Sequence, residues 1–353
     1  MPMAPDPHPG SRPSAALRVG VVGTGLIAGL TVQAMAASGG CRPVAVSSRQ
    51  RASAEAFAAT HGLGQAFGDW RDLVASPAID AVYVATPTAP REAICLQAVR
   101  LGKHVLAEKP FASLSSLQAI TAACSAAGVA FMDATHFVHH PRTAALKALL
   151  AERIGRVQAL RSSFFFPTTE RANVRFDPAQ EPMGAIGDMA WYAMRAVAEF
   201  AAPATGLRHS TGFLQRDEAT GAAVRGAGVL QLADGCTVTW DVGYNCGACT
   251  MDLQLLGEHG VITLDDFVLD WAQGFILPRA GVAAGFSCRA GVVNPDGFEW
   301  VPAPSESPQN VLMMERFAAL ARNPNGFDAA DSRRASERTQ ALLDAVWHSL
   351  RLN

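Results

Sequence analysis

Residues 23–28 have the spacing of a phosphate-binding turn. They read G-T-G-L-I-A, after an apolar run and before a segment of helical composition. Gly23 permits a tight turn, Gly25 lets the backbone approach a pyrophosphate, and Ala28 is small enough for close packing of a helix on a strand. The free N–H groups at the start of such a helix favour phosphate. The pattern predicts a dinucleotide site, with a tight turn that binds nothing as the alternative. The residues assigned to this site are Gly23, Gly25, Leu26 and Ile27.

The tip of the next strand-like run carries no acidic residue. It reads V-S-S-R over residues 46–49. An enzyme that uses NAD usually has Asp or Glu here to bind the ribose 2′-hydroxyl. Ser48 can instead hydrogen-bond a 2′-phosphate, and Arg49 can pair with it. We therefore favour NADP(H) over NAD(H), while an exposed, solvated arginine is the alternative.

A third apolar run, residues 79–85, ends at Thr86 and Pro87. Ligands of open α/β sheets bind outside the carboxyl ends of the strands. We therefore expect Thr86 and Pro87 to contact the ribose or nicotinamide of a dinucleotide. A simple turn after a buried strand explains the same residues equally well.

Lysine and tyrosine are rare in this chain. Only three of its 29 basic residues are lysines, and it has three tyrosines among 353 residues. Arginine stays protonated in proteins, whereas the charge of a lysine can be tuned. The scarcity therefore hints that a lysine or tyrosine was kept for chemistry, although a coding bias toward Arg also accounts for it. The residues concerned are Lys103, Lys109, Lys147, Tyr83, Tyr192 and Tyr244.

Asp188 and Tyr192 stand four residues apart in a segment of helical composition. Residues i and i+4 share one face of a helix, so both side chains can enter one cleft. Both residues are therefore candidates for a substrate site. The alternative for Tyr192 is a buried tyrosine whose hydroxyl has a structural partner.

Residues 133–143 hold three histidines at the predicted junction of two domains, where a substrate cleft forms. His139 and Arg142 are the candidate substrate contacts of this segment. Histidines so close together can also indicate a metal site, but no acidic or cysteine partner stands at ligand spacing. No metal is predicted.

The seven cysteines are odd in number and scattered along the chain. This usage is typical of reduced intracellular thiols rather than of a disulfide scaffold, and we expect a cytoplasmic protein. Cys246 and Cys249 have C-x-x-C spacing, but a zinc site would need a second pair of ligands. We interpret them as two incidental core thiols.

The length and composition predict a globular chain of about two domains. Apolar residues make up 49% of the chain, and the net charge is −2. The charge gives no reason to expect nucleic acid or a membrane surface as partner. Residues 19–37 superficially resemble a secretory signal, but four glycines interrupt them, and we interpret the segment as a buried strand, a turn and a helix.

The order of the predicted elements changes near residue 134. Strands and helices alternate over residues 17–134, which predicts a doubly wound parallel sheet. Over residues 135–331 strands and helices segregate, which predicts an α+β domain with a mostly antiparallel open sheet. Residues 1–16 are expected to be a disordered tail, and residues 332–353 a C-terminal helix that packs back on the body.

Residues 102–110, G-K-H-V-L-A-E-K-P, carry a specific resemblance. With Asp188 and Tyr192, they make the chain similar to the Gfo/Idh/MocA family of nicotinamide-dependent oxidoreductases, which includes sugar, inositol and dihydrodiol dehydrogenases. The resemblance covers about residues 17–350. It implies a Rossmann domain and an open-sheet domain that forms a homodimer or homotetramer. Tyr192 stands where many members have histidine.

The resemblance also implies roles. Glu108 lies at the cofactor, and Lys109 contacts both the cofactor and the substrate oxygen, where it stabilises negative charge. Tyr192 would be the general acid/base, and Asp188 would bind a substrate hydroxyl. Lys109 and the positive ring of the cofactor would lower the pKa of Tyr192. The resulting expectation is an NADP(H)-dependent oxidoreductase that moves a hydride between nicotinamide and a carbinol carbon. The substrate would be a polyhydroxylated small molecule: a sugar, a polyol or a trans-dihydrodiol. An NAD-dependent glycoside hydrolase and a nucleotide-sensing protein without turnover are the alternatives.

Overall fold

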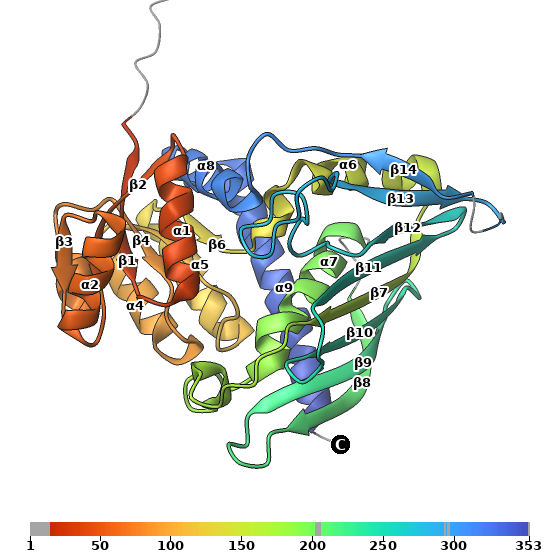
Figure 1. Ribbon diagram of the computed structural model, residues 1–353, viewed down its shortest axis with the longest axis horizontal. Helices are drawn as coiled ribbons and strands as arrows, with labels where there is room; N and C mark the ends of the chain where they lie inside the picture. Colours follow the sequence, from red (N-terminus) through yellow and green to blue (C-terminus); the bar gives the residue numbers. More distant parts are fainter. Residues whose placement is uncertain (1–14, 202–205, 293, 295–296, 352–353) are drawn as a thin grey trace, which may run out of the picture.

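The protein has two lobes, each built on its own β-sheet (Figure 1). The computed structural model describes residues 15–201, 206–292, 294 and 297–351. Most of the tail predicted over residues 1–16 lies outside these ranges. Within them, no helix is both long enough and apolar enough to cross a membrane.

The first lobe contains a six-stranded sheet in the order β3-β2-β1-β4-β5-β6, with every pair of neighbours parallel. This confirms the predicted doubly wound sheet. The short β3 and the helix that follows it were not predicted, because runs of three and six residues give almost no periodic signal. The strands are β1 (Leu17–Val22), β2 (Cys41–Ser47), β3 (Gln65–Phe67), β4 (Ala81–Val84), β5 (His104–Ala107) and β6 (Phe131–Asp133).

Helices cover both faces of this sheet. Buried residues of α1 and α2 pack on one face, and those of α3, α4 and α5 on the other. Because both faces are covered, the strands are apolar along their whole length, which explains the continuous runs in the sequence. The helices are α1 (Leu26–Ala37), α2 (Arg51–His61), α3 (Trp70–Ala75), α4 (Thr88–Arg100) and α5 (Leu114–Ala127).

The second lobe contains an eight-stranded sheet in the order β14-β13-β12-β11-β7-β10-β9-β8. All neighbours are antiparallel except β7 and β10, which confirms the mostly antiparallel sheet. The strands are β7 (Val157–Phe165), β8 (Leu207–Arg216), β9 (Ala223–Leu232), β10 (Thr237–Gly243), β11 (Thr250–Gly257), β12 (Gly260–Leu264), β13 (Gly285–Ala290) and β14 (Glu299–Pro302).

Two C-terminal helices join the lobes. The long helix α9 contacts α5 and β6 of the first lobe and α7 and β8 of the second (Figure 1). Helix α8 lies in the segment assigned by sequence to the second domain, yet it packs against α1 of the first lobe. The α-helices of this half are α6 (Pro141–Leu149), α7 (Trp191–Phe200), α8 (Gln309–Arg322) and α9 (Phe327–Arg351).

Single turns of other helix types flank α6 and α7. The 3-10 turn η1 (His136–His139) precedes α6, and the π-helical turn η2 (Leu150–Ile154) follows it. A second π-helical turn, η4 (Ile186–Ala190), runs directly into α7, so the predicted helix over residues 186–200 is one continuous helical segment with two geometries. Such turns occur frequently at functional sites, and Asp188 lies in η4.

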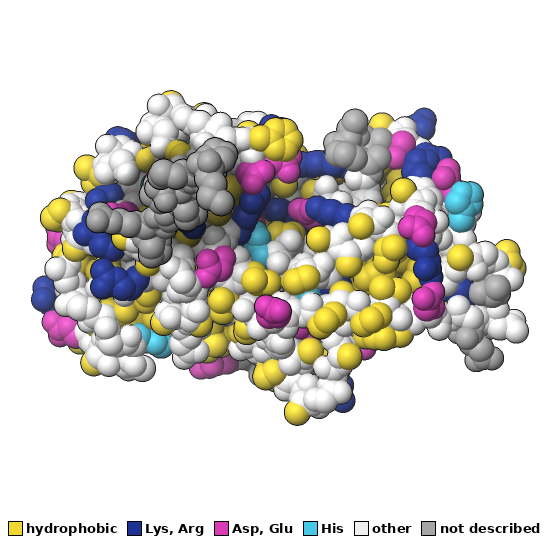
Figure 2. Space-filling model, turned by 90° about the horizontal axis from the view of Figure 1, so that it is seen from above, with side chains coloured by type: hydrophobic (Ala, Val, Ile, Leu, Met, Phe, Trp, Pro, Cys, Tyr) yellow, Lys and Arg dark blue, Asp and Glu magenta, His cyan; other side chains and the backbone are white. Residues whose placement is uncertain are grey.

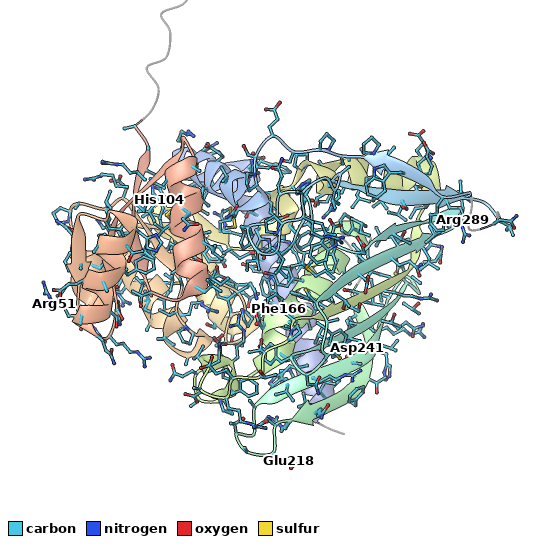
Figure 3. The ribbon with its side chains drawn as sticks, viewed as in Figure 1. Arg51, His104, Phe166, Glu218, Asp241 and Arg289 are labelled. Atoms are coloured by element: carbon cyan, nitrogen blue, oxygen red, sulfur yellow. The ribbon has the colours of Figure 1, made fainter. Side chains whose placement is uncertain are left out.

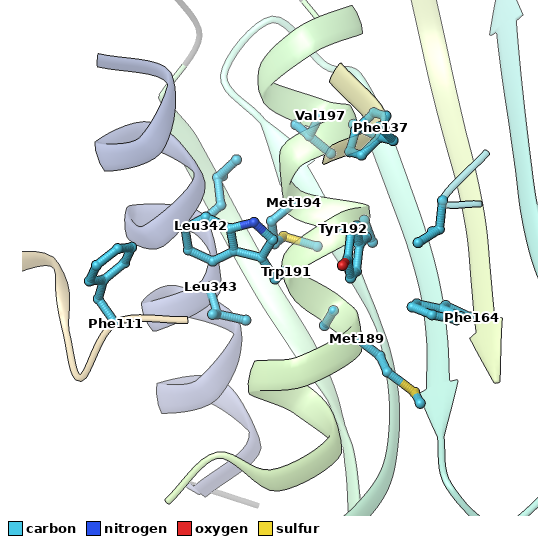
Figure 4. Packing of buried hydrophobic residues seen from close by; sticks show 14 of the residues in the cluster. Phe111, Phe137, Phe164, Met189, Trp191, Tyr192, Met194, Val197, Leu342 and Leu343 are labelled. Carbon is cyan, nitrogen blue, oxygen red and sulfur yellow. The ribbon is translucent and has the colours of Figure 1, made fainter. Parts of the chain in front are cut away.

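Two consecutive residues of α7 face opposite sides of the helix. Trp191 is fully buried and faces α9 (Figure 4). Its indole N–H donates to Oγ1 of Thr135, between β6 and η1, at 2.7 Å. Tyr192 points the other way, toward Phe164 of β7 (Figure 4). The packing of Trp191 against α9 therefore fixes the side of the helix on which Tyr192 lies.

Candidate active site

A cavity of about 1220 Å³ lies between the two lobes. Its lining comes from the glycine-rich turn, the tip of β2, residues 85–91 and 108–110, the loop before α7, and residues 268–276. Figure 2 shows basic, acidic and histidine side chains gathered between the lobes, and Figure 3 places Phe166, which lines the cavity, at their junction. The volume exceeds that of an ordinary small-molecule pocket, so a dinucleotide and a second ligand fit together.

The glycine-rich turn has the geometry that its sequence predicts. Gly23 has φ +118, and a Cβ there would stand 2.6 Å from the Ala85 carbonyl oxygen, so glycine is required. A Cβ on Gly25 would meet nothing within 4 Å, so the backbone there is open to a ligand. Gly25 also caps α1 without a side-chain bond, and the first turn of α1 holds no acidic residue. These N–H groups are therefore available to a phosphate.

Polar side chains without partners line the same half of the cavity. The hydroxyls of Ser47 and Thr86 are buried and have no hydrogen-bond partner among the described residues. Ser48 and the exposed Arg49 lie at the tip of β2, also on the cavity wall. Buried polar atoms are normally paired, so these hydroxyls fit a site completed by a polar ligand. Together with the open turn, they fit a nicotinamide dinucleotide. The other predicted cofactor contacts, Leu26, Ile27, Pro87, Glu108 and Lys109, also line the cavity.

Glu108 lies deep in this wall. Its carboxyl accepts a hydrogen bond from the Tyr83 hydroxyl at 2.6 Å. Burial raises the pKa of Glu108, and the positive charge of Lys109 opposes that shift. The buried guanidinium of Arg91 donates to the backbone carbonyls of Thr86 and Pro110, so it ties the two loops beside Glu108 together.

The three predicted catalytic residues come together at the junction of the lobes. Lys109 Nζ lies 2.5 Å from Asp188 Oδ1 and 2.7 Å from the Asp188 carbonyl oxygen. The same Nζ stands 4.8 Å from the centroid of the Tyr192 ring. The Lys109 side chain is mostly buried, and all three residues line the cavity. The fold thus brings together residues that lie some 80 positions apart in the sequence.

Asp188 is held by more than Lys109. Arg175 Nε donates to Asp188 Oδ2 at 2.7 Å, and the Tyr244 hydroxyl donates to the same oxygen at 3.2 Å. Burial alone would raise the pKa of Asp188, but the charges of Arg175 and Lys109 outweigh it and hold that pKa well below its usual range. Both carboxylate oxygens are therefore occupied by protein donors.

Sequence reasoning missed Arg175 and Tyr244. Both line the cavity. Arg175 lies in an irregular stretch with no motif, so no sequence signal distinguished it from the other arginines. Tyr244 is one of three tyrosines in the chain, and that rarity was the available signal.

The expected lowering of the Tyr192 pKa is wrong for this structure. Burial raises that pKa well above its usual value, and the carboxylates of Glu108 and Asp188 raise it further. The positive charge of Arg175 opposes this shift but does not overcome it. Tyr192 therefore keeps its proton at neutral pH.

The substrate contacts predicted in the histidine segment need correction. His139 and Arg142 do not line the cavity; His136 does, 3.0 Å from the Tyr192 hydroxyl. Arg142 is buried and pairs with Asp266, at 2.5 Å from Nη1 to Oδ1. Its guanidinium is neutralised inside the second lobe, so its role is structural. Of this segment, His136 rather than His139 or Arg142 reaches the cavity.

The cysteines of the C-x-x-C pair were expected in the core, but neither is fully buried, and of the two only Cys249 packs against the core of the described residues. Cys246 and Cys249 are free, half-buried, and lie in the loop between β10 and β11. Across the described residues, no group of three or more His, Cys, Asp or Glu side chains is arranged to hold a metal ion.

Comparison with known proteins identifies the family. Residues 17–135 match an oxidoreductase family with an NAD-binding Rossmann fold, and residues 143–263 match the GFO/IDH/MocA C-terminal domain. A dTDP-3,4-didehydro-2,6-dideoxy-alpha-D-glucose 3-reductase from Streptomyces violaceoruber is 30% identical over 332 residues, which cover 93% of this chain and 92% of that protein. The chain belongs to the GFO/IDH/MocA family of oxidoreductases.

Solved structures share the fold. A 3-ketoreductase from Actinomadura kijaniata, in complex with NADP and TDP-benzene, has a TM-score of 0.82 at 24% identity and covers 95% of this chain and 98% of its own. A protein from gentamicin A biosynthesis, in complex with NAD, has a TM-score of 0.76 at 23% identity and covers 99% and 97%. Both nicotinamide dinucleotides thus occur on this fold.

Proposed function

We propose that this protein is an NADP(H)-dependent oxidoreductase that interconverts a carbinol and a carbonyl group of a sugar-type substrate. One observation carries the proposal: Lys109, Asp188 and Tyr192 meet in the same cavity as the open glycine-rich turn. A dinucleotide whose pyrophosphate lies at that turn would supply or accept the hydride through its nicotinamide. The protein side chains then have to handle the substrate oxygen and its proton.

Lys109 acts on the substrate oxygen, and Tyr192 acts on its proton. The Lys109 ammonium stabilises negative charge that develops on the substrate oxygen, because a preorganised cation in a buried site needs no rearrangement. Asp188 and its partners Arg175 and Tyr244 hold Lys109 in position. Tyr192, protonated at neutral pH, gives a proton to that oxygen in reduction. In oxidation it would first lose its own proton to solvent, and the tyrosinate would then take the proton of the substrate hydroxyl.

The preference for NADP(H) rests on the tip of β2. Ser48 and Arg49 line the cavity there, and no carboxylate follows the strand to bind a ribose 2′-hydroxyl. A guanidinium beside a serine hydroxyl matches the geometry and charge of a 2′-phosphate.

The cavity wall near Tyr192 suits a substrate with one polar and one apolar side. Phe164, Phe166 and Phe275 contribute aromatic surface. Arg175 and Asn310 contribute hydrogen-bond donors. A sugar ring has polar edges and apolar faces, and an aromatic wall stacks on the latter. The Streptomyces relative, named as the reductase of a dideoxy sugar nucleotide, supports a sugar-type substrate over a simple alcohol.

The protein is also proposed to form a homodimer or homotetramer through the open face of the second sheet. The β-ladder places Val229, Thr239, Arg161, Gln254, Thr263, Ser287 and Trp300 in one row across that face. Trp300 is 50% exposed and Val229 41% exposed. Exposed apolar side chains on an uncovered sheet face favour association. Light scattering should give two or four copies per particle, and a monomer would refute this.

The activity is tested by following reduced nicotinamide with a panel of sugars, polyols, dihydrodiols and keto sugars. We expect a substrate-dependent absorbance change, larger with NADP(H) than with NAD(H). Release of an aglycone from glycosides with no net absorbance change would instead identify an NAD-dependent hydrolase. Dinucleotide binding without turnover of any member would favour a sensor.

A further inference from the structure

The Tyr192 hydroxyl is the end of a buried chain of hydrogen bonds. His136 Nε2 lies 3.0 Å from Tyr192 Oη, and His136 Nδ1 lies 2.5 Å from Nε2 of Gln309. All three side chains are buried. They come from η1, α7 and α8, so only the tertiary structure brings them together.

The backbone fixes the orientation of the Gln309 amide. Its Nε2 also lies 2.7 Å from the carbonyl oxygen of Val268. A carbonyl oxygen only accepts, so the amide group facing it must be the NH₂. The reversed amide would place two acceptor oxygens against each other. The Gln309 oxygen is buried and has no hydrogen-bond partner among the described residues. The orientation of the amide is therefore set by the contacts of its NH₂ group alone.

That orientation selects the tautomer of His136. Burial lowers the pKa of His136 to about 3, and the positive charge of Lys109 acts in the same direction. The ring is therefore neutral at working pH and carries one N–H. Because Gln309 donates to Nδ1, that nitrogen must accept, and the hydrogen is on Nε2.

We infer that Gln309 is a positioning residue that, through the Nε2–H tautomer of His136, makes the Tyr192 hydroxyl a proton donor into the cavity. His136 donates to Tyr192 Oη, so the hydroxyl cannot give its own hydrogen to that ring. No other protein partner of this hydroxyl occurs within the part of the chain that the structure describes. Its hydrogen is thus left for a ligand. This inference rests on the proposed function for its catalytic consequence, but not for the tautomer itself.

The proton step then balances without a change of charge on His136. As a hydride adds to the carbonyl carbon, the π pair of the C=O bond moves to the oxygen, which takes the proton from Tyr192 Oη. The tyrosinate left behind accepts the hydrogen bond from His136 Nε2–H and lies beside Lys109 Nζ, which is 4.8 Å from its ring centroid. Solvent returns a proton to Tyr192 before the next turnover. The opposite tautomer would present a lone pair to Tyr192 and hold its proton away from the substrate.

The tautomer is measured by ¹⁵N NMR on histidine-labelled protein without added ligands, with the His136 signals assigned by their loss in His136→Asn. We expect the chemical shift of a protonated nitrogen at Nε2 and of an unprotonated nitrogen at Nδ1. Protonated Nδ1 in the wild-type protein overturns the inference. The tautomer is read from the wild-type spectrum, and the variant serves only to assign its signals.

Gln309→Met and Gln309→Glu test whether Gln309 sets the tautomer of His136. The first removes the donor and should give a mixture of tautomers; the second offers an acceptor and should favour Nδ1–H. Gln340→Met is the matched control, since Gln340 is a buried amide of α9 bonded to the Phe111 N–H and to Asp344. It should leave the His136 shifts unchanged. An unchanged tautomer in Gln309→Met refutes the role of Gln309.

Kinetics separate this inference from the proposed function. Gln309→Met should lower kcat by roughly 10- to 100-fold, no more than the low end of the effect of losing a general acid outright, with KM for the dinucleotide unchanged. A wild-type kcat in Gln309→Met, with His136 present as a mixture of tautomers, would overturn the catalytic part of the inference. If the wild-type protein turns over no substrate at all, the proposed function fails while the NMR result stands by itself.

Discussion

Lys109 Nζ and Asp188 Oδ1 lie 2.5 Å apart at the junction of the two lobes. Lys109 follows β5 of the first lobe, and Asp188 belongs to the π-helical turn before α7 in the second. The pair therefore depends on the relative position of the lobes. It also keeps the ammonium beside the Tyr192 ring, where the substrate oxygen is proposed to bind.

Removal of the Lys109 ammonium should abolish most activity while leaving the dinucleotide site intact. In Lys109→Ala we expect kcat to fall at least ~100-fold, the loss seen when a preorganised oxyanion stabiliser is removed. Dinucleotide binding, followed by nicotinamide fluorescence, should persist. Lys147→Ala is the control, because Lys147 is exposed and pairs with Glu199 outside the cavity. Full turnover by Lys109→Ala would reject the assigned role.

Asp188→Asn should change how stability depends on pH. The folded-state pKa of Asp188 is depressed, so its stabilising effect is present above the unfolded pKa of about 4 and is lost as pH falls below it. At pH 7 the variant should be less stable than the wild type. Between pH 5 and pH 3 that difference should shrink by about 1 kcal/mol. Urea denaturation at each pH measures it, and a difference that stays constant would contradict the depressed pKa.

Arg49→Ala should weaken NADP(H) far more than NAD(H). One charge-assisted bond to a 2′-phosphate at an exposed site is worth about 1.4 kcal/mol, or roughly tenfold in Kd. Binding of both dinucleotides is measured by calorimetry. Arg42→Ala, an exposed arginine near the other end of β2, should leave both affinities unchanged. Equal losses for the two cofactors would remove Arg49 from the 2′-phosphate site.

Arg142→Ala should destabilise the protein without changing substrate affinity. Arg142 and Asp266 are both buried, so removing the guanidinium leaves a buried carboxylate unpaired, at a cost of about 3–5 kcal/mol. Arg153→Ala, whose partner Glu299 is exposed, should cost less than about 1 kcal/mol. Denaturant unfolding checks both. A large rise in KM with unchanged stability would restore Arg142 to the substrate.

Much of the fold was predictable because its signals are local. The first lobe is a parallel sheet covered on both faces, so its longer strands are continuous apolar runs between helices. The turn at Gly23 could be predicted for the same reason, since a positive φ beside a crowded backbone leaves only glycine. β3 and α3 were missed because they are too short for periodicity to register.

The candidate site shows the same difference between local signals and long-range contacts. Sequence alone determined the dinucleotide turn, Lys109 in its motif, and the shared helix face of Asp188 and Tyr192, because each depends on residues a few positions apart. Tertiary structure decided that His136 rather than His139 faces Tyr192, that Arg142 pairs with Asp266 across 124 positions, and that Gln309 reaches His136 across 173. It also decided the sign of the Tyr192 pKa shift. Burial and neighbouring charge set that pKa, and both arise only when distant segments pack together.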